Sequence, residues 1–299
     1  MQWVESLQEY AESSVMATER DYWLQQMDRP CSLPVDYAIA DDTAAKAGIV
    51  SVYLDRPQTQ ALLSGIHQVY NTQINDVLLT ALAQTFATWT GVSKLRLDLS
   101  GSGREQVLKN ANTFPAMGLF TTKFPVVLDL TESLYQRESL ITIKEYLRSI
   151  PNGGIGYGIL KYLSDDREMR SQLQALPQAE VSFNYLGQYD RIIPSDSLFS
   201  LPPNSQGINY SVSQIPIYLL EITAIIVRER LQLSWTYNQA IHRPESIKRL
   251  AENLLETLSS LINHCQSLEK VTYTPSDFPE ANVSQQKLDQ FLAKINRVS

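Results

Sequence analysis

The feature that most restricts the fold is a pair of long apolar segments near the end of the chain. Residues 217–228 and 231–238 are rich in β-branched and aromatic residues, and only a short turn around Glu229 separates them. Strands joined by so tight a turn pair antiparallel, because a parallel connection needs a dozen or more residues. The chain therefore does not form the regular, all-parallel sheet of a doubly wound α/β protein.

Helical patterns alternate irregularly with further strands. Apolar residues recur at helical spacing over 74–90, where Thr72 is the expected cap, and over 244–265. Other segments predict helices at 1–29, 57–69, 133–149 and from Gly158, and strands at 49–54, 95–99, 118–130 and 180–186. Pro125 predicts that its strand lies at a sheet edge or a bulge. The order predicts an α/β sandwich with a mixed, largely antiparallel sheet.

Composition excludes several classes of protein. The chain has 299 residues, of which 43% are hydrophobic, and 25 Lys and Arg against 32 Asp and Glu give a net charge of −7. A negative charge disfavours general binding to nucleic-acid phosphates. The longest apolar stretch, 215–227, is short and contains Glu221, so no membrane span is predicted. Two distant cysteines, Cys31 and Cys265, and three histidines predict neither a disulfide framework nor a His-rich metal site. These properties indicate a reduced, cytoplasmic protein.

Two glycine-rich segments are candidates for ligand binding. The turn SGSGRE at 100–105 follows a strand, where Arg104 is placed to hold a carbonyl or phosphate and Glu105 a proton. The alternative is a plain turn with two solvated charges. The segment PNGGIGYG at 151–158 precedes a helix whose N–H groups suit an anion. Its alternative is a helix start that needs positive φ angles.

The third candidate is the strand SFNYLG at 182–187. Alternation places Phe183 and Tyr185 on one face and Asn184 on the other. An asparagine within a strand is unfavourable unless its amide has a hydrogen-bond partner. Asn184 is therefore either a satisfied buried amide or a donor directed at a ligand carbonyl.

Residues 187–215 have no periodicity and contain several Pro, Ser, Asn and Gly residues. A loop of this length within a compact domain is usually functional or a crossover to another unit. We therefore expect it to be the least compact part of the fold and to reach toward a neighbouring lobe.

Five segments follow one another in a characteristic order and spacing: NDVLLTAL at 75–82, SGSGRE at 100–105, MGLFTTKFPVVLDL at 117–130, IPNGGIGYG at 150–158 and VSFNYLGQYD at 181–190. As a set they resemble the core motifs of nonribosomal peptide synthetase epimerization domains. The tail YTPSDFP at 273–279 resembles the end of such domains. The resemblance extends over the whole chain and implies the condensation-domain superfamily, whose fold resembles chloramphenicol acetyltransferase.

The resemblance implies only the second of the family's two lobes. The family's first lobe carries a His-His-x-x-x-Asp-Gly motif, and this sequence contains no adjacent histidine pair. The implied division is a helical segment and lobe connector at 1–30, a C-terminal lobe at 31–274 and a linker at 275–299. Without a first lobe we expect an exposed docking face and weak self-association through it.

In the family, the reaction inverts the α-carbon of an aminoacyl or peptidyl thioester that the phosphopantetheine arm of a peptidyl carrier protein presents. Such chemistry needs a base, an acid on the opposite face and donors for the enolate oxygen. The resemblance assigns catalytic roles to Arg104, Asn184 and Tyr185, and we expect Arg104 and Asn184 on one open face of the sheet. It implies no bound cofactor, and as partners the carrier protein and an N-terminal lobe in cis or in trans.

Two departures from the family pattern bear on activity. Ser100 stands where the family's glycine turn usually has glutamate, and Ser102 stands where it has histidine. A serine hydroxyl does not replace a carboxylate near neutral pH without activation. Leu119 replaces the usual tryptophan of the next motif. We therefore expect the isolated chain to be catalytically silent.

Three interpretations of function stay open. The first is the C-terminal lobe of an epimerization-type domain. The second is a lobe of a peptide-bond-forming condensation domain, which the GGIGYG and FNYLG segments disfavour. The third is a non-catalytic lobe that binds a carrier protein or a partner chain, which Ser100 and the missing histidine motif favour. An unrelated α/β protein has little support.

Overall fold

The computed structural model describes residues 2–25, 32–37, 47–104, 118–133, 135–192, 217–268, 271–281 and 283–295. Its centre is a six-stranded sheet in the order β1-β6-β5-β4-β2-β3. The strands are β1 (Ala47–Tyr53), β2 (Lys94–Gly101), β3 (Thr122–Asp129), β4 (Val181–Gln188), β5 (Leu220–Val227) and β6 (Arg230–Asn238). The pairs β1–β6, β5–β6 and β2–β3 are antiparallel, whereas β4 pairs in parallel with β2 and with β5. The mixed, largely antiparallel sheet of the sequence prediction is confirmed.

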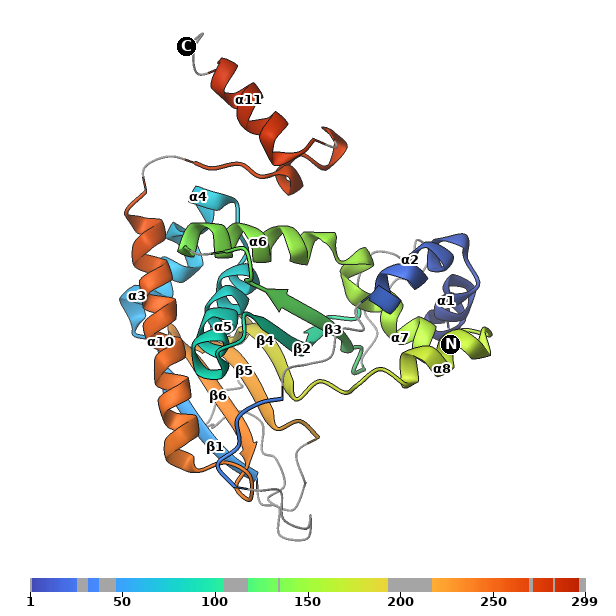
Figure 1. The fold of residues 1–299 in the computed structure, drawn as a ribbon, viewed down its shortest axis with the longest axis horizontal. Helices are drawn as coiled ribbons and strands as arrows, with labels where there is room; N and C mark the ends of the chain where they lie inside the picture. Colours follow the sequence, from blue (N-terminus) through green and yellow to red (C-terminus); the bar gives the residue numbers. More distant parts are fainter. Residues whose placement is uncertain are drawn as a thin grey trace.

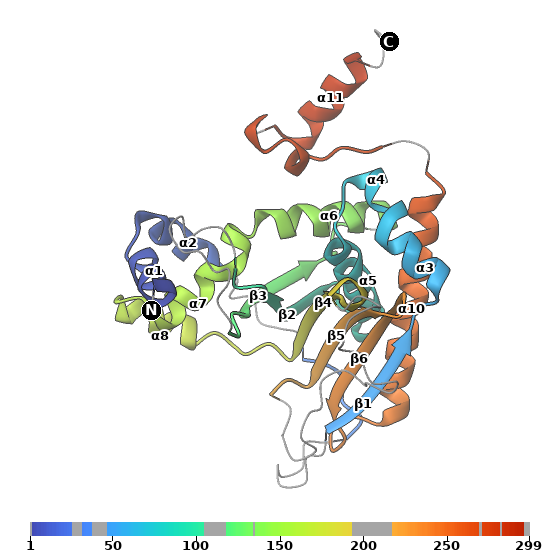
Figure 2. The same cartoon turned by 180° about the vertical axis from the view of Figure 1, so that it is seen from behind.

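The helices form two groups around this sheet. They are α1 (Gln2–Ala11), α2 (Ser14–Gln25), α3 (Arg56–Gln60), α4 (His67–Tyr70), α5 (Ile74–Thr90), α6 (Gln136–Ser149), α7 (Ile155–Tyr162), α8 (Arg167–Gln174), α9 (Tyr189–Ile192), α10 (Pro244–Gln266) and α11 (Gln285–Ile295). Helices α5, α6 and α10 cover one face of the sheet, and α1, α2, α7 and α8 gather beyond β3 (Figure 1). Helix α11 stands away from the body in both ribbon views (Figure 2).

Most of the strongly periodic segments fold as predicted. Helices α5 and α10 and the β5–β6 hairpin match their predicted positions, and β3, which contains Pro125, is an edge strand. Helix α7 begins at Ile155 rather than at Gly158, because the left-handed residues of the preceding turn end at Gly154. Residues 193–216, most of the predicted crossover loop, lie outside the described residues.

The cap expected for α5 is wrong by one residue. The backbone N–H of Gln73, not the side chain of Thr72, meets the helix, because it donates to Asp76 Oδ2 at 2.6 Å. Thr72 Oγ1 instead lies 3.2 Å from His67 Nδ1. A carboxylate in the first turn also favours the positive end of the helix dipole.

Strand alternation gives the sheet one apolar and one polar face. On the apolar face the Trp235 ring stacks on Phe86 of α5, with 6.2 Å between ring centroids. The inward side of α10 adds buried leucines and isoleucines, each contributing about 1.5–3 kcal/mol when fully buried. On the opposite face Asp98, Ser182, Glu221 and Thr236 are register partners across β2, β4, β5 and β6. The helix layer thus leaves a polar row on the other side of the sheet.

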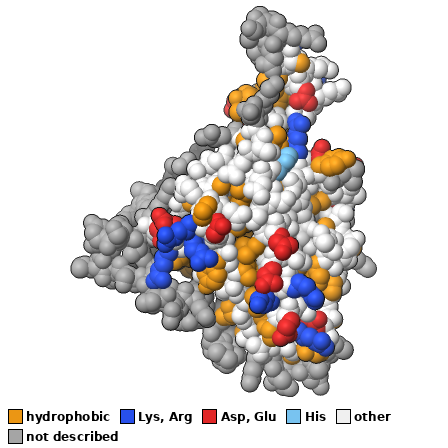
Figure 3. Space-filling model, turned by 90° about the vertical axis from the view of Figure 1, so that its left-hand side faces the viewer, with side chains coloured by type: hydrophobic (Ala, Val, Ile, Leu, Met, Phe, Trp, Pro, Cys, Tyr) orange, Lys and Arg blue, Asp and Glu red, His pale blue; other side chains and the backbone are white. Residues whose placement is uncertain are grey.

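The outer surface of α10 carries charges of both signs, such as the Lys248–Glu252 pair at 3.9 Å. On the side of the molecule where α10 lies, Lys and Arg side chains are interspersed with Asp and Glu (Figure 3). The coloured residues of this face therefore form no extended basic surface of the kind that nucleic acids require.

An aspartate from the fifth motif holds the β5–β6 turn. Arg228 and Glu229 both have positive φ angles, of 54° and 61°. Their backbone N–H groups donate to the two carboxylate oxygens of Asp190, at 2.8 and 2.9 Å. Two successive N–H groups in such a turn form a natural anion site. Asp190 therefore compensates for a hairpin turn that contains no glycine.

A buried lysine anchors the C-terminal segment. The Lys144 side chain of α6 is only 1% exposed, and its ammonium group donates to Tyr70 O, Thr274 Oγ1 and Asp277 Oδ1 at 2.6–2.8 Å. The adjacent Glu145 accepts hydrogen bonds from the N–H and hydroxyl of Ser276. The start of the segment expected as a linker is thus fixed on α6. The domain boundaries themselves stay a prediction.

We expect Lys144→Met to lower the free energy of unfolding at pH 7 by about 3–5 kcal/mol, because it leaves the Asp277 charge buried without its partner. Burial opposes ionisation of Asp277, but hydrogen bonds from Lys144, Thr274 and Asn71 outweigh it and lower its pKa. A lowered folded-state pKa adds stability above the unfolded value of about 3.9, and this stability is lost as the pH falls through the folded value.

Urea unfolding at several pH values measures the effect. The difference between wild type and Lys144→Met should shrink below about pH 4, whereas it should stay constant between pH 6 and 8. In an Asp277→Asn background, Lys144→Met should lose this pH dependence. A difference that is equally large at pH 3 and pH 7 would contradict the role of the ion pair.

Candidate functional site

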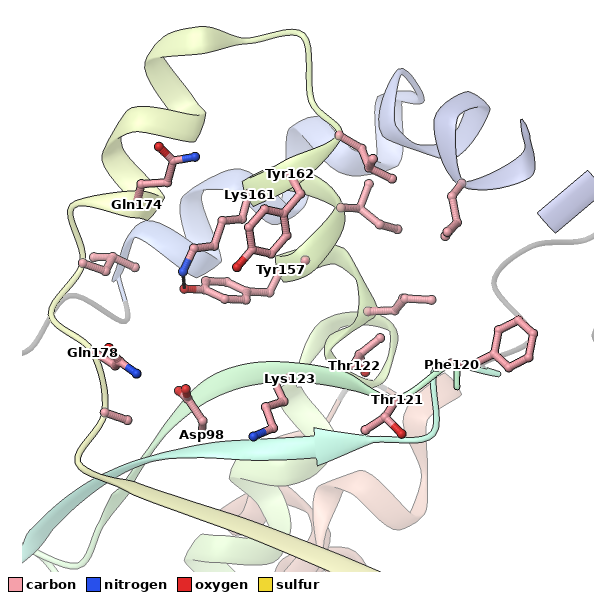
Figure 4. Close-up of a pocket in the computed structure, with 18 of the residues that line it drawn as sticks. Asp98, Phe120, Thr121, Thr122, Lys123, Tyr157, Lys161, Tyr162, Gln174 and Gln178 are labelled. Atoms are coloured by element: carbon pink, nitrogen blue, oxygen red, sulfur yellow. Dashed lines mark hydrogen bonds between the residues drawn. The ribbon is translucent and has the colours of Figure 1, made fainter. Parts of the chain in front are cut away.

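A pocket with a volume of about 690 Å³ lies between the polar face of the sheet and α7. Three of the sequence motifs contribute to its wall: Gly103 from the glycine turn, residues 120–123 at the start of β3, and residues 155–158 at the start of α7. Trp3 of α1 and Tyr218, which precedes β5, complete much of the lining. Segments far apart in the sequence therefore meet at one concave site (Figure 4).

A carboxylate and a phenol pair on the strand side of the pocket. The Tyr218 hydroxyl donates to Asp98 Oδ2 at 2.8 Å, and Lys123 Nζ lies 4.6 Å from the centroid of the Tyr218 ring. Burial, and then the negative charge of Asp98, raise the pKa of Tyr218 far above its usual range. The phenol therefore stays protonated and occupies one oxygen of Asp98.

The sequence analysis did not single out Asp98 or Tyr218. The alternation of β2 places Asp98 on a polar face, and this was the only signal in the sequence. The two residues are 120 positions apart in the chain. They meet because β4 pairs between β2 and β5, which a local pattern does not specify.

The glycine turn holds Arg104 against an aromatic ring. Gly103 has a φ of 68°, and a Cβ atom there would lie 1.5 Å from the carbonyl oxygen of Phe120. The Arg104 guanidinium lies 4.1 Å from the centroid of the Phe120 ring, which Trp3 contacts edge-on at 5.6 Å. Cation–π contacts of this kind contribute about 0.5–2 kcal/mol. The turn therefore has a defined conformation that places Arg104 beside the pocket.

The other expected site residues fall on two different faces of the sheet. Asn184 is half-buried and pairs with Thr223, on the polar face that Asp98 and Ser182 share. Tyr185 faces the opposite way and packs against the hydrophobic core. Ser100 lies two residues after Asp98, so it too faces the polar side. The structure thus brings Ser100 and Asn184 to the face beside the pocket, and the catalytic roles stay predictions.

The glycine-rich start of α7 is a structural turn. Asn152, Gly153 and Gly154 all have positive φ angles, which agrees with the second interpretation of this segment. The buried carboxylate of Glu19 lies so close that a Cβ atom on Gly156 would be 1.9 Å from its Oε2. The side chains of Trp23 and Asn152 donate to the same carboxylate. The helix start therefore faces an anion of the protein itself.

The described residues offer neither a metal site nor a membrane span. Among them, no group of three or more His, Cys, Asp and Glu side chains is arranged to hold a metal ion. None of the described helices combines the length and hydropathy needed to cross a bilayer. The chemistry of the pocket therefore rests on the side chains and backbone groups named above.

Comparison with known proteins identifies the fold family. The model of the condensation domain matches residues 1–283. The chain belongs to the condensation-domain family. It is 41% identical over 294 residues to one of the linear gramicidin synthases of Brevibacillus parabrevis, in a match that covers 98% of this chain and 4% of that protein. The sequence resemblance to the condensation-domain superfamily is thereby confirmed.

Solved structures of related domains share the fold. The epimerization domain from the third module of tyrocidine synthetase B superposes with a TM-score of 0.81 at 32% identity, covering 89% of this chain and 60% of that one. A cyclization-docking bidomain from Sorangium cellulosum superposes with a TM-score of 0.64 at 16% identity, covering 87% and 51%. This condensation-family chain thus spans about 60% of the length of the epimerization domain.

We expect Gly103→Ala to distort the glycine turn of this family member. The residue would need a left-handed conformation that costs roughly 1–2 kcal/mol, and its Cβ atom would clash with the backbone of Phe120. Gly158→Ala is the matched control, because no atom lies within 4 Å of a Cβ there and the position is helical. This control should stabilise the protein by about 0.5–1 kcal/mol. Urea midpoints distinguish the two, and equal midpoints would contradict the packing described for Gly103.

Proposed function

We propose that this chain is the C-terminal lobe of a nonribosomal peptide synthetase epimerization domain. With a first lobe, it inverts the α-carbon of an aminoacyl or peptidyl thioester. The observation that carries the proposal is the difference between the structural matches. The TM-score is 0.81 at 32% identity for an epimerization domain, but 0.64 at 16% identity for a cyclization bidomain. Coverage of 60% of the epimerization domain supports one lobe rather than a whole domain.

The polar face supplies groups suited to this reaction. The α-proton beside a thioester is weakly acidic, so its removal depends on stabilising the enolate oxygen. Among the described residues, none forms a hydrogen bond with the Asn184 side chain, which leaves its amide available to a substrate carbonyl. Arg104 adds a permanent positive charge beside the pocket.

The proposed partners follow from the same assignment. A peptidyl carrier protein presents the substrate on its phosphopantetheine arm, and this chain itself holds no cofactor in the proposed reaction. The N-terminal lobe docks beside the pocket, where Leu119 and Tyr162 are 94% and 66% exposed. Large apolar side chains exposed in this way favour contact with a partner. In the absence of a first lobe we expect weak self-association through this face.

The test supplies the first lobe of the tyrocidine synthetase B epimerization domain in trans, with an aminoacyl-loaded carrier protein in deuterated solvent. We expect no α-proton exchange with the chain alone, because the histidine motif is absent, and measurable exchange with the mixture. Asn184→Ala in the mixture should slow exchange. Exchange by the chain alone, or none in any mixture, would contradict the proposed function.

A non-catalytic lobe that binds a carrier protein is the second candidate, and Ser100 is the observation that favours it. General acid–base catalysis typically contributes about 10²–10⁴-fold, which a serine at this position does not supply. We therefore expect Ser100→Glu to accelerate exchange in the completed domain, by up to about that factor. Ser102→Glu is the control, because it adds the same charge beyond the end of the strand. If Ser100→Glu exchanges no faster than this control, the binding function is favoured.

A further inference from the structure

Two side chains one turn apart on α7 form a pair inside the pocket. Tyr157 is 8% exposed, and its ring packs against Trp23 with 5.3 Å between centroids. Its hydroxyl reaches the pocket wall, where Lys161 Nζ lies 3.3 Å from the phenol oxygen (Figure 4). The fold thus fixes the ring of Tyr157 and leaves its polar end at the pocket.

The direction of this hydrogen bond follows from the chemistry of the two groups. An ammonium group only donates hydrogen bonds, so the Tyr157 oxygen accepts and its own hydrogen stays available. Among the described residues, no acceptor takes that hydrogen. Tyr218 differs, because it already donates to Asp98. Tyr157 is therefore the phenol of the pocket that is free to donate to a ligand.

Tyr157 keeps its proton at neutral pH. Burial raises its pKa, and the positive charge and hydrogen bond of Lys161 oppose this without overcoming it. Asp98 raises the pKa further, although Arg96 lowers it. The group therefore acts as a hydrogen-bond donor rather than as a base.

The pocket also favours negative charge on a bound oxygen. Its wall contains Arg96, Lys123 and Lys161 against the single carboxylate of Asp98, in a chain whose net charge is −7. Preorganised donors and positive charge in a concave site stabilise oxygen atoms that gain negative charge during a reaction. A carbonyl oxygen beside Tyr157 would experience both.

We infer that this pocket binds a thioester carbonyl, with the Tyr157 hydroxyl donating to the carbonyl oxygen and Lys161 as the positioning residue that orients that hydroxyl. The inference rests on the proposed function, which supplies the thioester. Tyr157 keeps its proton throughout and stabilises the charge that forms on the oxygen as the α-proton leaves. Neither residue was singled out by the sequence analysis.

Binding to the full chain tests the site without any need for activity. The probes are S-acetyl-pantetheine and S-ethyl-pantetheine, which differ in the thioester carbonyl oxygen, and dissociation constants come from NMR titration. We expect the acetyl probe to bind about 3–10-fold more tightly, as one hydrogen bond of 0.5–1.5 kcal/mol provides. Tyr157→Phe should abolish this preference. Tyr135→Phe, on an exposed residue at the start of α6, should retain it.

The Lys161 variants test the positioning role. Lys161→Met should reduce the preference for the acetyl probe, whereas Lys161→Arg, which keeps a donor, should restore much of it. A wild-type chain that binds the two probes equally, or binds neither, would overturn the inference. A preference that survives in Tyr157→Phe would overturn it too.

Exchange in the completed domain separates this inference from the proposed function. Removing one oxyanion donor typically costs about 10²–10³-fold in rate, so Tyr157→Phe should slow α-proton exchange by that factor. If no variant exchanges but the probe preference depends on Tyr157, the carbonyl site stands and epimerization fails. If Tyr157→Phe exchanges as fast as wild type, the epimerase assignment stands and the inference fails.

Discussion

The stacking of Trp235 on Phe86 joins the middle of the sheet to the helix layer, and the site depends on it. Once one side of each strand is committed to α5 and α10, alternation turns Asp98, Ser182 and Asn184 to the other side. A register slip of one residue would exchange the faces and bury the polar row against the helices. The apolar contact therefore decides where the chemistry of this lobe can occur.

Buried charges then fix the segments that surround the sheet. Helix α6 carries both Lys144, which holds the C-terminal segment, and Arg148, which donates to the two oxygens of the fully buried Asp76 at 3.0 and 2.7 Å. The end of α6 leads directly into the glycine turn that starts α7. Glu19 holds that turn from the other side. The position of Tyr157 is thus determined by contacts at both ends of a continuous stretch of chain.

Local periodicity was sufficient to predict α5, α10, the β5–β6 hairpin and the opposite faces of Asn184 and Tyr185. It failed for α8, where only Met169 and Leu173 are buried, so the apolar stripe is too sparse to produce a helical signal. It also missed every contact between distant segments, such as Tyr218 with Asp98 and Lys144 with Thr274. These contacts depend on the strand order, in which β4 lies between β2 and β5. Period and turn residues identify elements, but they do not specify which elements become neighbours.

The chemistry that converges on the pocket is unbalanced in a way that fits one half of a two-lobed site. The groups that would meet a substrate are donors: the Asn184 amide, the Arg104 guanidinium and, in our inference, the Tyr157 hydroxyl. The Asp98 carboxylate already accepts a hydrogen bond from Tyr218, and position 100 has a hydroxyl instead of a carboxylate. Donors stabilise charge on an oxygen, but they do not remove a proton from carbon. On the proposed function, this lobe holds the thioester oxygen, and the base that takes the α-proton comes from the other lobe.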